Sequence, residues 1–116
     1  MNGLHKAGYA RYYDAGTEVT LEGRISAVLQ DQPGQAFVAC TVDVSSMNLP
    51  VETGPSWFLT KQNFNLREGD EVTVIGSMVP YGDSYAVVAR EIHTDGRRLF
   101  LREPSGSPLW KLTSPE

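Results

Sequence analysis

The chain of 116 residues has the length of one domain, and its formal net charge of −4 argues against an avid nonspecific binder of duplex nucleic acid, which normally presents a basic face. Its single cysteine, Cys40, excludes an internal disulfide and a cysteine-ligated zinc site. No run approaches the roughly 18 apolar residues of a membrane-spanning helix, and residues 1–16 lack the apolar core of a signal peptide.

The N-terminal region divides into an arm and a long first strand. Residues 1–16 combine three glycines and three tyrosines without a period, which predicts a loosely ordered arm before a single domain at 17–116. We expect the tyrosines to pack back on the domain; the alternative is that they stack on a ligand. In TEVTLEGRISAVLQ the apolar alternation runs to Ile25 and shifts phase at Val28, which predicts a β-bulge, with Gly23 where the strand coils tightly.

Two further strands and a short helix are expected next. After the turn DQPGQ, the stretch AFVACTVDV alternates and has a predicted core face of Val38, Cys40, Val42 and Val44. LPVET, from Leu49, is typical of a third strand, and Pro50 places it at a strand start or a sheet edge. Pro55 suits a first helical turn, and SWFLTKQN has the length of two turns. We expect Trp57 and Phe58 to plug one end of a barrel, so that Trp57→Ala costs about 3 to 5 kcal/mol if the ring is fully buried.

The second half of the chain predicts two or three more strands. EVTVIGSMV has inward residues Val72, Val74, Gly76 and Met78. The turns PYGDS and TDG bracket YAVVAREI, whose alternation allows two registers, with the core face carrying either Val87 and Ala89 or Val88 and Ile92. RRLFLRE predicts a last strand, and the tail is expected to pack on the barrel; their inward residues are Leu99, Leu101, Leu109 and Trp110.

This order of three strands, a short helix and two or three further strands is the order of an OB-fold. The long, bulged first strand fits the same fold, because it must reach two edges of a curled sheet. The predicted fold class is therefore all-β with one short helix, an OB-fold-like Greek-key barrel of five to six strands.

The stretch from Gly54 to Trp110 resembles a family of small bacterial proteins, often exported, that carry a general OB-fold or DNA-binding label. The family's motifs are Gly-Pro-x-Trp-aromatic, Gly-Asp-x-Val-x-Val-x-Gly-Ser, Ala-Arg-Glu-Val/Ile and Leu-Arg-Asp/Glu…Gly-x-Pro-Leu/Val-Trp; they match residues 54–58, 69–77, 89–92 and 101–110. YDAGTEVTLEGRI is similar to the family's first strand. The resemblance implies an exported or periplasmic protein whose leader is absent from this chain; otherwise the expected compartment is the cytoplasm.

The sequence lacks a Gly-x-Ser-x-Gly elbow, a phosphate-cradling glycine loop and a His-Glu-x-x-His helix. His5 and His93 lie far apart, and nothing in the sequence indicates that they meet. Cys40, expected to be buried without a base beside it, is a poor nucleophile. We therefore expect no enzyme, no catalytic residue, no metal site and no cofactor.

OB-folds that bind oligonucleotides or oligosaccharides use the exposed side of strands two and three with the adjoining loops. The candidate ligand-binding residues of this chain are Phe37, Thr41, Tyr81, Tyr85 and Arg90. Phe37, on the non-core face, suits stacking on a base; the alternative is that the arm or the tail covers it. The local basic surplus of residues 84–111 suits either a solvated hairpin face or a phosphate-binding patch.

The sequence thus predicts a non-catalytic OB-fold binding module for a protein or an envelope component. Single-stranded DNA binding through the exposed barrel face is the alternative, and the acidic total weighs against it because backbone neutralisation supplies most nonspecific affinity. We expect a monomer without a membrane span.

Overall fold

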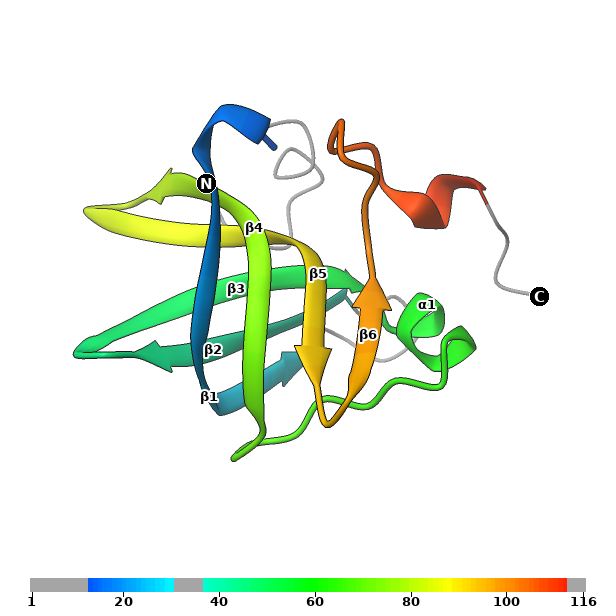
Figure 1. The fold of residues 1–116 in the computed structure, drawn as a ribbon, viewed down its shortest axis with the longest axis horizontal. Helices are drawn as coiled ribbons and strands as arrows, with labels where there is room; N and C mark the ends of the chain where they lie inside the picture. Colours follow the sequence, from blue (N-terminus) through cyan, green and yellow to red (C-terminus); the bar gives the residue numbers. More distant parts are fainter. Residues whose placement is uncertain (1–12, 31–36, 113–116) are drawn as a thin grey trace.

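The computed structural model describes residues 13–30 and 37–112, which form a closed β-barrel with one short α-helix (Figure 1). In chain order the elements are η2 (Ala15–Thr17), β1 (Glu18–Gln30), β2 (Phe37–Val44), β3 (Met47–Pro55), α1 (Ser56–Lys61), β4 (Glu71–Tyr81), β5 (Ser84–Thr94), β6 (Arg97–Phe100) and η3 (Leu109–Leu112). The loop DQPGQ and most of the predicted arm lie outside the described residues, so the arm's boundary stays a prediction.

Five strands close the barrel and a sixth extends it. β1 pairs antiparallel with both β2 and β4, and the hairpins β2–β3 and β4–β5 continue the sheet on either side. β3 and β5 then pair in parallel, with Val51 opposite Val87, and this pairing closes the barrel. β6 is added antiparallel to β5. With α1 between β3 and β4, this connectivity is that of an OB-like barrel, and the predicted fold class is confirmed.

β1 serves two neighbours because it bends at a bulge. Its register with β2 shifts around Ser26, which confirms the bulge predicted from the change of apolar phase. A Cβ atom on Gly23 would lie 2.2 Å from the backbone oxygen of Asp43, so only glycine allows β1 and β2 to approach this closely. The bulge changes which side chains of β1 face inward. Val28, beyond the bulge, is nevertheless 36% exposed, so its side chain is not fully buried in the core.

The barrel end next to α1 is plugged by Phe58 and Leu59, which are both buried. The prediction of a Trp57–Phe58 plug was wrong for Trp57, which is half-buried and meets the edge of Phe58 with ring centroids 5.7 Å apart. Consecutive helical residues point about 100° apart, so a short helix across the barrel end directs Phe58 inward and leaves Trp57 at the rim. Pro55 ends β3 in an extended conformation before α1 begins, and α1 has six residues rather than the expected eight.

β5 resolves the ambiguous register by being buried on both faces. All residues from Ala86 to Ala89 have 0% exposure. The main core contains Val87, Ala89 and Ile92, because a register shift around Arg90 returns Ile92 to the inner face. Val88, on the outer face, belongs to a second cluster on which Tyr13 packs. Each predicted register therefore described only part of the strand.

Tyr13 covers this outer face and also meets the C-terminal end of the described chain. We call Tyr13 together with the segment Leu101–Trp110 the terminal clasp (Figure 1). Gly106 has φ +99°, and a Cβ atom there would lie 2.8 Å from the Tyr13 ring, so the two parts of the clasp meet in close contact. Leu109 and Trp110 pack partly buried against the core, as predicted.

Candidate functional site

The five candidate residues taken from the sequence do not gather at one place. Phe37 begins β2 opposite Pro55, next to α1, and its ring meets the edge of Trp110 at a centroid distance of 5.6 Å. Tyr81 and Tyr85, 37% and 50% exposed, belong to the β4–β5 hairpin, which projects away from α1 (Figure 1). The tail thus covers part of Phe37, which is the alternative that the sequence left open.

Thr41 and Arg90 are engaged within the protein. The Thr41 hydroxyl lies 2.6 Å from the hydroxyl of Ser26. The Arg90 guanidinium donates two hydrogen bonds to Glu18, at 2.9 and 3.0 Å, and one to Glu91 at 2.9 Å. These bonds raise the pKa of Arg90, and the same contact with Arg90 lowers the pKa of Glu18. Arg90 therefore serves first as the centre of a structural charge network, while ligand roles for the five residues remain predictions.

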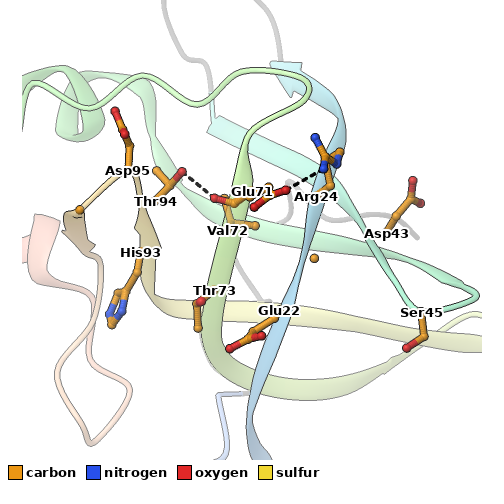
Figure 2. A pocket seen from close by; sticks show the side chains of 12 residues that line it. Glu22, Arg24, Asp43, Ser45, Glu71, Val72, Thr73, His93, Thr94 and Asp95 are labelled. Carbon is orange, nitrogen blue, oxygen red and sulfur yellow. Dashed lines mark hydrogen bonds and ion pairs between the residues drawn. The ribbon is translucent and has the colours of Figure 1, made fainter.

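A different surface offers a concave site. An open groove of about 820 Å³ crosses the outer face of β1, β4 and β5 (Figure 2). It is lined by Glu22, Gly23, Arg24, Asp43, Ser45, Glu71, Val72, Thr73, His93, Thr94, Asp95 and Gly96. We call it the acidic groove.

Strand register builds the wall of the acidic groove. Glu22 pairs with Thr73, and Thr73 pairs with His93, so the three side chains form one row across three strands. Their row lies on the face opposite the core, because successive strand residues point to opposite faces. The Asp95–Gly96 turn, with φ of +56° and +74°, forms one end and confirms the predicted two-residue hairpin turn.

The groove carries a negative charge that its own cations do not balance. Arg24 donates to Glu71 at 2.7 Å and to the backbone oxygen of Gly69 at 3.2 Å, and Figure 2 shows the first contact as a dashed line. Four carboxylates against one guanidinium leave three negative charges when His93 is neutral. The Arg24 and Glu71 side chains are 60% and 76% exposed, so their ion pair is worth only about 0 to 1 kcal/mol and can exchange partners.

Sequence reasoning missed the acidic groove because its carboxylates come from four separate positions in the chain. The sequence feature that could have indicated the groove is the charged outer face of the first strand, where Glu22 and Arg24 lie opposite the predicted core face. Only the pairing of β1 with both β2 and β4 brings these side chains beside Asp43 and Glu71.

The described residues offer little other reactive chemistry. Among residues 13–30 and 37–112, no group of three or more His, Cys, Asp or Glu side chains is placed to hold a metal ion. Within the same residues, no helix is long and apolar enough to cross a membrane. Cys40 is 1% exposed, and burial raises the pKa of its thiol to about 12, so the thiolate is not formed at neutral pH. What the groove presents is carboxylate and hydroxyl oxygens, which suit cationic groups.

The fold and the groove together define a small OB-like barrel protein with an acidic outer face. The model of the MamS/MamX magnetosome protein family matches residues 17–99, more than two thirds of the chain. The chain therefore belongs to this family. The match supports the resemblance to a bacterial family, but its description carries neither an OB-fold nor a DNA-binding label. A comparison with curated proteins finds no significant match.

Proposed function

We propose that this protein is a non-catalytic binding module whose acidic groove takes a basic segment of a partner protein. The observation that carries the proposal is the surplus of three carboxylates in an open groove of about 820 Å³. Complementary charge of this kind speeds association and selects partners more than it adds affinity. A cationic segment would gain from Glu22, Asp43 and Asp95 without displacing a buried ion pair.

The same charges disfavour the alternative of single-stranded DNA, whose phosphates need cations. Arg90, the candidate for a phosphate contact, is held by Glu18 and Glu91. The ring of Phe37 is partly covered by Trp110. Tyr81 and Tyr85 are exposed on their hairpin, where DNA bases could stack on the two rings. An experiment therefore has to distinguish DNA binding at this hairpin from peptide binding in the acidic groove.

The family's description as magnetosome proteins supports a partner at the magnetosome. The resemblance to exported proteins supports the periplasm as the compartment in which the two proteins meet. The proposed partner is thus a protein of the bacterial envelope or of the magnetosome, with a lysine- or arginine-rich segment that is accessible to the groove.

A chemical-shift titration of the full ¹⁵N-labelled chain tests the proposal. The probes are a decalysine peptide and a mixed single-stranded DNA oligomer, each added at about 20 mM and about 150 mM salt, where charge screening differs strongly. We expect the peptide to shift amides of Glu22, Thr73 and His93 and to bind more weakly at the higher salt. DNA is expected to leave them unchanged.

Matched variants locate the interaction. Glu22→Gln combined with Asp95→Asn removes two groove charges and should weaken peptide binding roughly 2- to 30-fold, at about 0.2 to 1 kcal/mol per exposed pair. Asp83→Asn removes one charge from the exposed β4–β5 turn, outside the groove, and should leave the affinity nearly unchanged. The proposal would be overturned if the peptide shifted only amides on other surfaces. It would also be overturned if DNA shifted the amides of Tyr81 and Tyr85 while the peptide shifted none.

A further inference from the structure

A carboxyl group of the barrel and a guanidinium group of the terminal clasp are both buried, and their charges interact. Glu52 and Arg102 are each 2% exposed. Glu52 lies on β3, opposite Val88 in the parallel pairing with β5, and its Oε1 has no hydrogen-bond partner among the described residues. The same holds for Nε and Nη2 of Arg102. Ionised groups at this depth cost several kcal/mol unless they are paired and hydrogen-bonded.

Burial lowers the pKa of Arg102, and contacts within the clasp offset part of the cost of burying its charge. Its Nη1 donates to the backbone oxygen of Gly106 at 2.9 Å. Its guanidinium carbon lies 5.0 Å from the ring centroid of Trp110 and 5.9 Å from that of Tyr13, so the cation faces two aromatic rings. Arg102 therefore connects both parts of the clasp, one from each end of the described chain.

Glu52 is the group that this environment leaves in its neutral form. Burial raises the pKa of Glu52 to about 8, and the charge of Arg102 opposes the rise without cancelling it. At neutral pH the carboxyl group therefore carries its proton, and the buried site holds a single positive charge.

We propose that the terminal clasp is a pH-sensitive latch, which lies closed on the barrel while Glu52 is a neutral carboxylic acid and loosens when Glu52 releases its proton to solvent. The barrel side of the site is fixed by the ladder between β3 and β5. The clasp side, Tyr13 and Leu101–Trp110, is the layer that can move aside and admit water to a new carboxylate. Loosening would expose Trp110 and, with it, the ring of Phe37 that packs against it.

The other titratable groups around the latch keep their charge state in the relevant interval. Arg102, in the clasp, interacts with the charge of Glu52 and lies over the ring of Tyr13. Burial and the neighbouring Glu18 raise the pKa of Tyr13 to about 12. The pKa of Glu18 is lowered by hydrogen bonds from Arg90 and Tyr13. Between pH 6 and pH 9, Glu52 is thus the member of this set that changes charge.

Amide hydrogen exchange of the full chain at pH 6 and pH 9 tests the latch, with protection factors corrected for the intrinsic effect of pH. Two bonds between the clasp and β5 report on closure: the N–H groups of Leu101 and Arg102 both donate to the backbone oxygen of Arg90, at 2.8 and 3.3 Å. Their protection should fall by roughly a hundredfold between the two pH values, because each of the two pH units from 6 to 8 favours the open form tenfold and the effect levels off above the closed-form pKa of about 8. Barrel amides such as that of Cys40 should keep their protection.

Two variants and one direct titration complete the experiment. Glu52→Gln should keep the clasp protected at both pH values, whereas Glu68→Gln, at an exposed position, should behave like the unmodified protein. The ¹³C shift of the Glu52 carboxyl group, followed in the unmodified protein, should change over the same pH interval as the protection and gives a test even if Glu52→Gln fails to fold. A clasp that stays protected while Glu52 titrates would overturn the proposal and indicate an ion pair with Arg102. Loss of protection without titration of Glu52, or an equal loss in Glu52→Gln, would also overturn it.

Discussion

Glu52→Gln is expected to remove a fall in global stability that the unmodified protein shows as the pH rises. The folded-state pKa of Glu52, about 8, lies above its ordinary value of 4.5. The folded protein therefore binds the Glu52 proton more tightly than the unfolded chain does. This contribution to the free energy of unfolding is fully present below pH 4.5 and is lost as the pH rises through 8.

The size of the effect follows from the two pKa values. The interval from 4.5 to about 8 corresponds to about 5 kcal/mol, at about 1.36 kcal/mol for each pH unit. Because the unfolded chain is already ionised at pH 6 and the folded protein loses its proton near pH 8, about 3 kcal/mol of this falls between pH 6 and pH 9. Glutamine keeps the shape of the protonated side chain but does not titrate, so the variant should have a flat stability over this interval.

Urea unfolding at pH 6, 7, 8 and 9 measures the free energy of unfolding by linear extrapolation. The exposed control Glu68→Gln should lose about the same 3 kcal/mol as the unmodified protein. A flat profile for the unmodified protein would refute the raised pKa of Glu52. A profile of Glu52→Gln that runs parallel to that of the unmodified protein would assign the pH dependence to another group.

Three further predictions concern the barrel. Gly23→Ala should cost about 1 to 3 kcal/mol in urea unfolding, because the new methyl group would overlap the backbone of Asp43; a loss below about 0.5 kcal/mol would contradict this close approach. Phe58→Ala should cost about 3 to 5 kcal/mol and Trp57→Ala clearly less, since only the Phe58 ring is buried. A larger loss for Trp57→Ala than for Phe58→Ala would contradict the orientation of α1 described above. Cys40 should react with a thiol reagent only at the rate of unfolding, and rapid labelling of the native protein at pH 8 would contradict its burial.

Much of the barrel is encoded locally and could be predicted from the sequence. The apolar alternation of β2 identified its buried residues, because a strand that faces water on one side must alternate. The phase change between Ile25 and Val28 predicted the bulge that the structure places at Ser26, and the Asp95–Gly96 pair specified its hairpin turn. The position of α1 after the third strand then selected the OB-like connectivity.

The candidate sites were decided by the tertiary structure. Sequence periodicity assumes that a strand has one covered face, whereas Tyr13 packs on the second face of β5 and Glu52 on β3 is buried as well. The acidic groove depends on four chain segments meeting across β1, and its carboxylates at positions such as Glu22 and Asp95 look like ordinary solvated residues when read singly. The sequence by itself determined which residues enter the barrel, because that depends on local period and turn chemistry. Which polar residues become buried or gathered together depends on contacts between distant segments, and these exist only in the closed barrel.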